Sequence, residues 1–436
     1  MIVPIVFENE QYTREKPVYL WVFYKFASLC LKSGAPIITT HDYAKKPSYF
    51  KSINHSAVNV MDYYGINDET YKKLNIYTIS KTKVINKYKN GLDAWINLLS
   101  KRDKNLEKEI EKAVLEITKN GQKIDAFMVW TWLPSIEYIA KKYNIKVINQ
   151  EGSAIRQPFY SRLLNYFQFQ NKFDSTGIIE KYDELLKNND VLFLTRKEIL
   201  ALLIDKQNIN YLKHLDDVPE YEIGYGLGLN TDCFKAVYSE IDDEKVFEYL
   251  NSVSDSDKVC IRPHPKDPID VSKYGFVEDK TPSPFLWILK CKSIVTDLSN
   301  IGYEVLLLGR NLISLSDRMP SSFSKKTNLS YLDDNVVSIR KVNFLTFYWF
   351  TPEELTQDIK YVNWRLSSPK VIDVYNYNLN YLLNEIGTSI EEVKNISPKE
   401  RQKFILNKRN IVFDEGQNNI NKKSKLNIFR RKKWKI

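Results

Sequence analysis

Short runs of apolar, β-branched and aromatic residues recur along this chain, and segments of helical length separate them. Runs bounded by Gly, Pro, Asn or Ser are typical of buried strands. Strands that alternate with helices predict parallel sheets, because a parallel connection needs a crossover of about a dozen residues or more. The strands predicted in the first half of the chain are Ile2–Phe7, Pro36–Thr40, Asp125–Trp130, Ile145–Asn149 and Val191–Thr195.

The segments between these strands have the apolar periodicity of helices. Tyr19–Leu31 is followed by the stop signal Ser33-Gly34, and Arg102–Lys119 carries an apolar stripe with charged residues elsewhere. Ser135–Tyr143 fills the crossover before the strand that begins at Ile145. The first half of the chain therefore predicts a βαβ domain with a parallel sheet.

A second set of predicted strands lies between residues 258 and 317. The run Lys258–Pro265 stops at a histidine between two prolines, Ser293–Thr296 turns directly into a helix, and Leu312–Ser316 follows. These three strands predict a second parallel sheet. The polar stretch His214–Pro219 is the predicted linker, and the aromatic-rich segment Val342–Trp364 is predicted to pack back across the domain junction.

The length of the chain, 436 residues, exceeds one ordinary core and suits two domains. We predict an α/β protein in which two Rossmann-like parallel-sheet domains face a cleft, with C-terminal helices packed back on the N-terminal domain. In open sheets of this kind a ligand binds beyond the carboxyl ends of the strands. The predicted divisions are an N-terminal domain 1–217, a C-terminal domain 218–345, return helices 346–400 and a basic tail 401–436.

Composition narrows the class of protein. A hydrophobic content of 43% and an aromatic content of 13% exclude wholesale disorder. The four cysteines are scattered without Cys-x-x-Cys spacing, so they predict neither a disulfide framework nor a zinc site, and a reducing cytoplasm fits best. The apolar stretch Trp21–Leu31 is about half the length needed to span a bilayer, and nothing resembles a signal peptide.

A histidine at the end of a predicted strand is the first candidate for chemistry. His264 stands between Pro263 and Pro265, which hold the backbone stiffly, and its imidazole can donate to a phosphate oxygen or protonate a leaving phosphate. Arg262, two residues earlier, points to the same side of the strand. The alternative is a histidine that only hydrogen-bonds a loop carbonyl, and the Arg-Pro-His-Pro sequence at a strand end favours the functional interpretation.

A turn rich in short polar side chains follows the next strand. Thr296, Asp297, Ser299 and Asn300 stand where a strand becomes a helix. Helix-terminal N–H groups together with short hydroxyls can bind an anion. Such a site would hold a phosphate or a sugar carboxylate without a metal. An ordinary helix cap is the alternative, and the spacing after His264 favours anion binding.

Two carboxylates and an arginine complete the candidate site. Glu151 lies on a glycine turn after Ile145–Asn149 and can act as a general base or hydrogen-bond a sugar hydroxyl. Arg156 can bind a carboxylate in a bidentate manner, and a surface salt bridge is the alternative for both residues. Asp232 follows three alternate glycines, which let the backbone approach a ligand closely. Their spacing is not that of a dinucleotide fingerprint, and the sequence holds no Walker-type phosphate loop, zinc cluster or nucleophile elbow.

Three motifs together resemble those of one group of enzymes. They are Gln150-Glu151-Gly152, Arg262-Pro263-His264-Pro265 and Ser299-Asn300-Ile301-Gly302. In this order they resemble the motifs of bacterial surface-polysaccharide glycosyltransferases of the GT-B fold that use CMP-activated acidic sugars. The retaining β-Kdo transferases of capsule and lipopolysaccharide O-antigen assembly are the most similar. Arg156-Gln157-Pro158-Phe159 and Trp364-Arg365-Leu366-Ser367 also resemble segments of those enzymes.

The resemblance implies a role for each candidate. Asp232 would attack the anomeric carbon of Kdo and release CMP before an acceptor hydroxyl displaces the aspartate, and two inversions give net retention. His264 would stabilise the leaving phosphate, Ser299 with Asn300 would hold CMP, and Glu151 would assist the acceptor. The resemblance also implies an N-terminal acceptor domain and a C-terminal nucleotide-sugar domain. Its expected donor is CMP-Kdo, its acceptor a saccharide or lipid-linked saccharide, and it needs no cofactor or metal.

Other functions stay open at this stage. A CMP-sialic acid sialyltransferase shows a similar Glu-Gly, His-Pro and Ser/Thr series. A CDP-polyol phosphotransferase of surface polymer synthesis shows a Pro-His-Pro and a turn like Thr296–Ser299. A non-catalytic protein that binds nucleotide or glycan is a further interpretation. In the segment Tyr166–Asp174 a glutamine replaces the family's aspartate, so the acceptor and the linkage are not assigned.

The end of the chain is strongly basic. The whole chain has 64 basic and 54 acidic residues, a formal net charge of +10, and Asn421–Ile436 alone holds eight Lys and Arg residues beside Phe429 and Trp434. Cations with interfacial aromatics predict docking on anionic lipid, and a solvated end or a nucleic-acid contact is the alternative. We expect a cytoplasmic protein that docks peripherally on the anionic inner leaflet of the inner membrane through residues 421–436, and no nucleic-acid partner.

Overall fold

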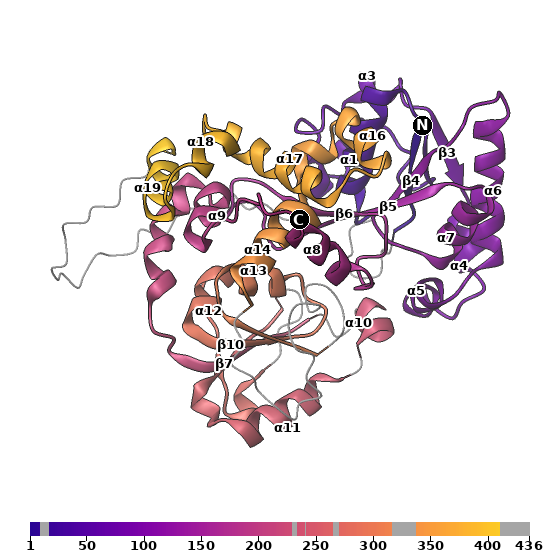
Figure 1. The fold of residues 1–436 in the computed structure, drawn as a ribbon. Helices are drawn as coiled ribbons and strands as arrows, with labels where there is room; N and C mark the ends of the chain where they lie inside the picture. Colours follow the sequence, from indigo (N-terminus) through magenta and orange to yellow (C-terminus); the bar gives the residue numbers. More distant parts are fainter. Residues whose placement is uncertain (9–16, 229–232, 240, 265–269, 316–336, 410–436) are drawn as a thin grey trace.

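The computed structural model describes residues 1–8, 17–228, 233–239, 241–264, 270–315 and 337–409. The described chain forms two β-sheets, and helices pack around both of them (Figure 1). The predicted nucleophile Asp232 and the predicted membrane segment 421–436 lie outside these residues.

The first sheet has seven strands in the order β12-β6-β5-β4-β1-β2-β3. Strands β1 to β5 are parallel to one another, whereas β6 pairs antiparallel with both β5 and β12. Every residue of β1 and β4 is buried, which explains why these strands read as continuous apolar runs. The strands are β1 (Ile2–Val6), β2 (Ile37–Thr40), β3 (Ile76–Ile79), β4 (Ala126–Val129), β5 (Lys146–Gly152), β6 (Leu164–Gln168) and β12 (Phe350–Pro352).

The second sheet has five strands, all parallel, in the order β11-β10-β7-β8-β9. It uses the chain from Tyr221 to Ser314, and the predicted boundaries at 217, 345 and 400 stay predictions. The strands are β7 (Tyr221–Gly226), β8 (Val259–Arg262), β9 (Val277–Glu278), β10 (Cys291–Thr296) and β11 (Asn311–Ser314).

The two sheets share one topology. In each, the first parallel strand lies in the middle, two strands follow on one side, and the chain then crosses to the other side. The strand order therefore reverses between β1 and β4 in the first sheet and between β7 and β10 in the second. Ligands of open α/β sheets bind beyond the carboxyl ends of the strands at such switch points. The prediction of two Rossmann-like domains is confirmed.

Helices cover both faces of the first sheet. On one face α1 (Leu20–Ser33) packs with Ile2 and Val6 of β1. On the other face Val3 and Ile5 pack with α5 (Gly91–Ser100), α6 (Lys104–Thr118) and α7 (Pro134–Lys142). The predicted helices Tyr19–Leu31, Arg102–Lys119 and Ser135–Tyr143 are therefore confirmed as α1, α6 and α7, whereas α5 was not predicted. Strand alternation sends neighbouring residues of β1 to opposite layers.

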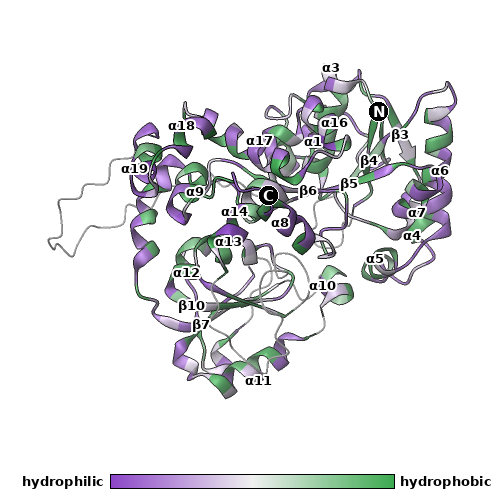
Figure 2. Ribbon diagram, in the orientation of Figure 1, coloured by the Kyte–Doolittle hydropathy of each residue, from purple (hydrophilic) through white to green (hydrophobic). Residues whose placement is uncertain are grey.

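Hydropathy follows this layering. Figure 2 shows hydrophobic residues gathered along β7 and β10 and a mixture of hydrophobic and hydrophilic residues along the outer helices α6 and α11. The other α-helices of the described residues are α2 (Pro47–Ser52), α3 (Asp68–Tyr71), α4 (Lys81–Ile85), α8 (Ile178–Leu186), α9 (Arg196–Leu203), α10 (Cys233–Tyr238), α11 (Asp243–Val253), α12 (Pro284–Lys290), α13 (Ile301–Leu307), α14 (Ile339–Phe344), α15 (Glu353–Thr356), α16 (Ile359–Leu366), α17 (Val371–Asn384), α18 (Ile390–Lys394) and α19 (Pro398–Lys408). A π-helical turn covers Leu345–Trp349, and 3-10 helices cover Ser56–Val60, Lys206–Asp216, Ser256–Lys258 and Ser272–Tyr274.

The segment after the second sheet packs back on the first domain, as predicted. The Lys25 ammonium on α1 is fully buried and lies 2.6 Å from a carboxylate oxygen of Glu353, at the start of α15. Asn165 of β6 completes this group, because its amide donates to Glu353 at 2.6 Å and accepts from Lys25 at 2.8 Å. Leu355 and Tyr361 join the core beside α1. A buried charge needs such a partner, so the return segment is an integral part of the first domain.

The predicted strand Val191–Thr195 is wrong. Its backbone at Leu194 pairs with a side chain instead of a strand: the Asn343 side chain accepts from the Leu194 N–H at 2.8 Å and donates to the Leu194 carbonyl at 2.7 Å. Thr195 then caps α9 in a reciprocal capping box with Glu198. An apolar run that leads into a buried helix cannot be told from a buried strand by its pattern.

Gly224 and Gly226, predicted to bring the backbone close to a ligand, lie inside β7. A Cβ atom at Gly224 would come within 2.6 Å of a methyl group of Ile294 and 2.9 Å of the Trp287 ring. Gly224 is therefore explained by the close packing of Trp287 against the sheet. Close approach of a ligand to the backbone is not needed to explain the glycine at this position.

Candidate functional site

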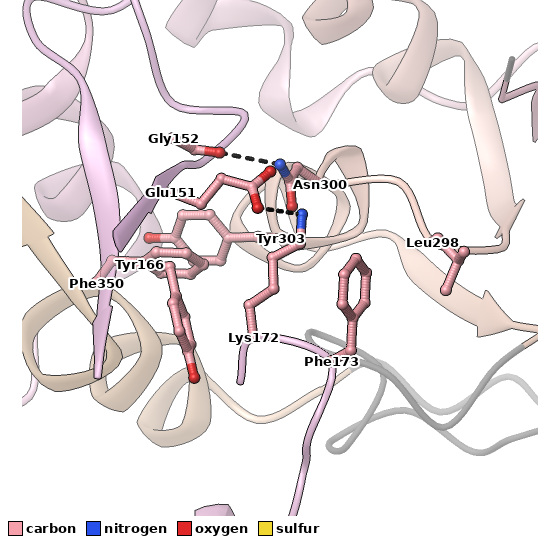
Figure 3. A pocket seen from close by; sticks show the side chains of 9 residues that line it. All are labelled: Glu151, Gly152, Tyr166, Lys172, Phe173, Leu298, Asn300, Tyr303 and Phe350. Carbon is pink, nitrogen blue, oxygen red and sulfur yellow. Dashed lines mark hydrogen bonds and ion pairs between the residues drawn. The ribbon is translucent and has the colours of Figure 1, made fainter. Parts of the chain in front are cut away.

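The carboxyl edges of the two sheets meet at a pocket (Figure 3). The first sheet contributes Glu151 and Gly152 at the end of β5, and the second contributes Leu298 and Asn300 from the turn between β10 and α13. The enclosed cavity is about 20 Å³, which is the room of about one water molecule. A nucleotide sugar needs roughly 300 Å³ or more and has to extend beyond it. The other lining residues are Tyr166, Lys172, Phe173, Tyr303 and Phe350.

Strand pairing places Glu151 at this pocket. β5 continues to Gly152, three residues beyond the predicted end, because β6 pairs with it antiparallel. Glu151 stands opposite Tyr166 in that register, and Tyr166 also lines the pocket. Its pairing with β6 holds the backbone of Glu151 more firmly than a loop would.

Glu151 forms an ion pair inside the pocket. Its carboxylate lies 2.5 Å from the Lys172 ammonium, and the two side chains are only 20% and 15% exposed. The Lys172 backbone N–H donates to the Asn149 side chain at 2.8 Å, and its ammonium lies 4.5 Å from the Phe173 ring centre. Glu151 therefore does not form the exposed surface salt bridge that was the alternative interpretation. The pair is largely buried and faces the second sheet (Figure 3).

Asn300 connects the two sheets directly. Its amide donates to the Gly152 carbonyl at 2.9 Å (Figure 3). It stands at the N-cap position of α13, but its side chain makes no capping hydrogen bond. The helix-cap alternative therefore does not account for Asn300, which fixes the second sheet's turn against the end of β5.

The rest of the predicted anion turn lies at the end of β10. Thr296 is buried, and its hydroxyl oxygen makes no hydrogen bond to any residue that the structure describes. Ser299 is half-buried, and its hydroxyl accepts from the Ile301 N–H at 3.3 Å. Asp297 lies between them and is also half-buried. These residues stand at the switch point between β7 and β10.

Three predicted residues are described outside the lining of this pocket. Arg262 forms an ion pair with Asp279 and donates to Thr281 at 3.3 Å, so its guanidinium is held within the second domain. Arg156 is exposed on the first domain. His264 is half-buried just beyond the end of β8, on the far side of β7 from β10.

The residues that follow Asp232 pack against the first domain. Cys233 is fully buried in the core beneath α5, α6 and α7. The next residue, Phe234, lies 5.4 Å from Phe173 and 5.6 Å from the Lys172 ammonium, measured to ring centres. The first two residues after Asp232 therefore lie against the first domain, and Phe234 lies close to the Glu151–Lys172 pair.

Sequence analysis missed a buried carboxyl group at the first edge. Glu8 directly follows β1 and is 2% exposed. The Thr131 N–H donates to one of its oxygens at 3.2 Å, and the Thr131 hydroxyl donates to the other. The pKa of Glu8 is raised to about 8, chiefly because the group is buried. The negative charge of Glu151 adds to the rise, and the two Thr131 hydrogen bonds and the charge of Lys81 oppose it. The position after a strand was a signal that could have found it.

A second buried carboxyl group links the domains. Tyr160 of the first domain donates to a carboxylate oxygen of Glu304, on α13, at 2.5 Å. Burial raises the pKa of Glu304 to about 7, and the positive charges of Arg156 and Arg262 oppose that rise. The two predicted arginines therefore act on the junction behind the pocket rather than on its lining.

Lys172 and Phe173 were also missed as site residues. They follow β6, an antiparallel strand that the apolar pattern did not predict. The sequence analysis marked this segment only as a departure from the related enzymes, and no residue type within it signals a pocket. Within the described residues, no group of three or more His, Cys, Asp or Glu side chains is arranged to hold a metal ion. The expectation of a metal-free reaction stays a prediction.

Comparison with known proteins gives one family match. Residues 6–176 match the Glycosyltransferase 99 family N-terminal domain. No curated protein matches the chain. Among the residues described, no helix is long and apolar enough to cross a membrane.

Several solved structures resemble the fold weakly. Thermosulfurimonas dismutans KpsC, described as a beta Kdo 2,7 transferase, is 14% identical with a TM-score of 0.37, over 59% of this chain and 89% of that one. KpsC from the same organism, described as a beta Kdo 2,4 transferase, is 12% identical with a TM-score of 0.33, over 56% and 87%. Methanocaldococcus jannaschii UDP-GlcNAc 2-epimerase is 13% identical with a TM-score of 0.30, over 73% and 84%. The family match over residues 6–176 and the two facing Rossmann-like sheets support a glycosyltransferase of GT-B architecture.

Proposed function

We propose that this protein transfers Kdo from CMP-β-Kdo to a saccharide acceptor with retention, in capsule or lipopolysaccharide O-antigen synthesis. The observation that carries the proposal is the junction of Asn300 with Gly152. It sets the carboxylate of Glu151, from one sheet, against the hydroxyl- and amide-rich turn of the other. A transfer reaction needs this juxtaposition, because donor and acceptor have to be held at one point.

The donor belongs to the second edge in this proposal. Phosphate oxygens need hydrogen-bond donors, and the turn after β10 carries the Thr296 hydroxyl, whose oxygen has no partner among the described residues, together with Ser299 and Asn300. His264, beyond β8, can donate to the same phosphate. Arg262 is committed to Asp279, so we assign it to holding the end of β8 and not to the nucleotide.

The reaction proceeds through two displacements. The Asp232 carboxylate attacks the anomeric carbon of Kdo, the bond from that carbon to the phosphate oxygen breaks, and CMP leaves with the electron pair. The acceptor hydroxyl then attacks the same carbon, and the Asp232 oxygen leaves as carboxylate. Glu151, whose carboxylate lies 2.5 Å from the Lys172 ammonium, takes the proton of the acceptor hydroxyl. Two inversions give retention.

Release of CMP from three donors tests the proposal. The protein is incubated separately with CMP-Kdo, CMP-sialic acid and CDP-glycerol, and the freed nucleotide is measured. We expect turnover of CMP-Kdo alone. Preference for CMP-sialic acid indicates a sialyltransferase, preference for CDP-glycerol a polyol phosphotransferase, and binding without turnover a non-catalytic protein.

Intact-mass analysis tests the mechanism. After incubation with CMP-Kdo and without acceptor, the wild-type protein should carry one sugar adduct that Asp232→Ala abolishes. A wild-type protein that turns over rapidly with no adduct on the reaction timescale contradicts the covalent intermediate.

A further inference from the structure

Helix α10 follows β7 of the second sheet along the chain but packs on the first domain. Its first residue, Cys233, is fully buried in the core of the first domain, and the helix lies against α5 (Figure 1). Lys235 ties the same helix to the second domain, because its ammonium lies 2.6 Å from the Asp243 carboxylate at the start of α11. Asp243 also accepts from the Tyr225 hydroxyl of β7 at 2.6 Å. Contacts with both domains therefore fix the position of α10.

The Lys172 ammonium in the pocket lies beside two aromatic rings, one from the first domain and one from α10. It is 4.5 Å from the Phe173 ring centre and 5.6 Å from that of Phe234. Both distances are within the roughly 6 Å at which the face of an aromatic ring attracts a cation. The two rings are 5.4 Å apart, and Tyr238 of α10 stacks on Phe173 at 4.3 Å. The ammonium that pairs with Glu151 is thus held by rings that meet across the domain boundary.

We propose that Phe234 is a positioning residue for Glu151, acting through Lys172, in the acceptor half of the site. The inference rests on the proposed function. A cation–π contact favours one place for the ammonium, over the face of the ring, so the Phe234 ring limits where Lys172 can put its charge. Lys172 in turn holds the carboxylate that takes the acceptor's proton, and a general base has to lie within hydrogen-bond reach of that proton. Because Lys235 joins α10 to the second domain, the base of the first domain is complete only while the second domain is docked on it.

The test uses CMP-Kdo alone, so that water is the acceptor. A rapid burst of CMP reports formation of the sugar adduct, and the later steady rate reports its hydrolysis, the step in which Glu151 takes a proton. Phe234→Leu keeps an apolar side chain but removes the ring. We expect its steady rate to fall about threefold to tenfold, as the loss of one partly buried cation–π contact implies, while the burst changes less than about twofold. Phe234→Tyr keeps the face of the ring and should retain the wild-type steady rate.

A double-mutant cycle separates positioning of the base from a general loss of structure. In the Glu151→Gln protein the base is already absent, so the addition of Phe234→Leu should lower the steady rate by less than about a further twofold. Val237→Ala is the matched control, because Val237 packs α10 on the same core without a ring, and its steady rate should stay within about twofold of wild type. Equal losses from Phe234→Leu with and without Glu151 overturn the inference. A loss in Val237→Ala as large as that in Phe234→Leu, or a wild-type steady rate in Phe234→Leu, overturns it as well.

Thermal unfolding tests the contact independently of the reaction. Phe234→Leu and Lys172→Met are measured singly and together. The melting temperature of the double variant should fall by less than the sum of the two single losses, since either change removes the same contact. Additive losses overturn the inference. No CMP release from the wild-type protein rejects the proposed function itself, and the unfolding cycle then still decides whether Phe234 holds Lys172.

Discussion

The five parallel strands of each sheet follow the same order, yet the carboxyl edges of the two sheets carry different chemistry. The first edge presents carboxyl groups, Glu8 after β1 and Glu151 near the end of β5, both largely withdrawn from solvent. The second presents a hydroxyl, an amide and an imidazole, on Thr296, Asn300 and His264. A shared topology supplies the positions, and the residue types at the strand ends decide what each edge can bind.

This difference indicates that one edge binds the acceptor and the other binds the donor in the proposed reaction. Carboxyl groups exchange protons with hydroxyls, which suits an acceptor, whereas hydroxyls, amides and imidazole donate to phosphate oxygens. Each edge can then be disturbed separately. The variants below should affect one half of the reaction and leave the other half intact.

Glu151→Gln should have the largest effect. It keeps the shape of the side chain but removes the base, which contributes about 10²- to 10⁴-fold to rates. We expect the steady rate with CMP-Kdo to fall by that factor while the initial burst of CMP changes less than about twofold. Rapid-quench kinetics measures both. Equal loss of burst and steady rate would show that the two edges do not divide the reaction.

The pH dependence of stability tests the buried state of Glu8. Its pKa is raised in the folded protein to about 8, so the folded state keeps a proton that the unfolded state has lost. The stabilisation is therefore complete below about pH 4.5 and is lost as the pH rises through about 8. Relative to wild type, Glu8→Gln should gain on the order of 3 kcal/mol in unfolding free energy between pH 5 and pH 9. Urea unfolding at both pH values measures this gain.

Thr296→Val tests the donor edge. Its hydroxyl oxygen has no hydrogen-bond partner in the described chain, so its removal should leave the unfolding free energy within about 0.5 kcal/mol of wild type. A lost hydrogen bond to the donor's phosphate should raise the KM for CMP-Kdo about tenfold. Thr39→Val is the matched control, because the buried Thr39 hydroxyl donates to the Val6 carbonyl at 3.1 Å in the first sheet. The control should lose about 1 kcal/mol and keep the donor KM.

Asn300→Ala should have the smallest effect. It removes the hydrogen bond to the Gly152 carbonyl, which contributes about 1 kcal/mol to stability. We expect the melting temperature to fall by a few degrees and the donor KM to rise a few-fold, as about 1 kcal/mol implies. The exposed Asn395→Ala serves as control. A change in kcat alone, with stability and KM preserved, would argue against a role in joining the edges.

Much of the fold was predictable because parallel strands are apolar along their whole length. The runs at β1, β4, β8 and β10 stood out for this reason. The same rule failed at Val191–Thr195, where an asparagine side chain replaces the neighbouring strand. It also missed β6, which pairs antiparallel with β5 on one side. On its other side β6 pairs with β12, about 180 residues further along the chain, and no local pattern announces that pairing.

The site was predictable only where a motif ends a predicted strand. Glu151 and Asn300 were found in this way, and the structure brings both to one pocket. Glu8 also ends a predicted strand but belongs to no motif, so it was passed over. Lys172 lies on a loop after an unpredicted strand, and its value depends on a tertiary contact with Glu151 that no spacing encodes.

The place of β12 in the first sheet has a consequence for synthesis of the chain on the ribosome. β6 emerges about 180 residues before Phe350–Pro352, the strand that covers its edge. Lys25 likewise has no ion-pair partner until Glu353 is synthesised. At ordinary translation rates this interval lasts on the order of 10 seconds or more. Until β12 is synthesised, the N-terminal half of the chain has an unpaired strand edge at β6, and its Lys25 lacks the carboxylate that neutralises it. Both features promote aggregation. A fragment ending near residue 217 would remain in that state, so we expect that the first domain cannot be produced by cutting the chain between the two sheets.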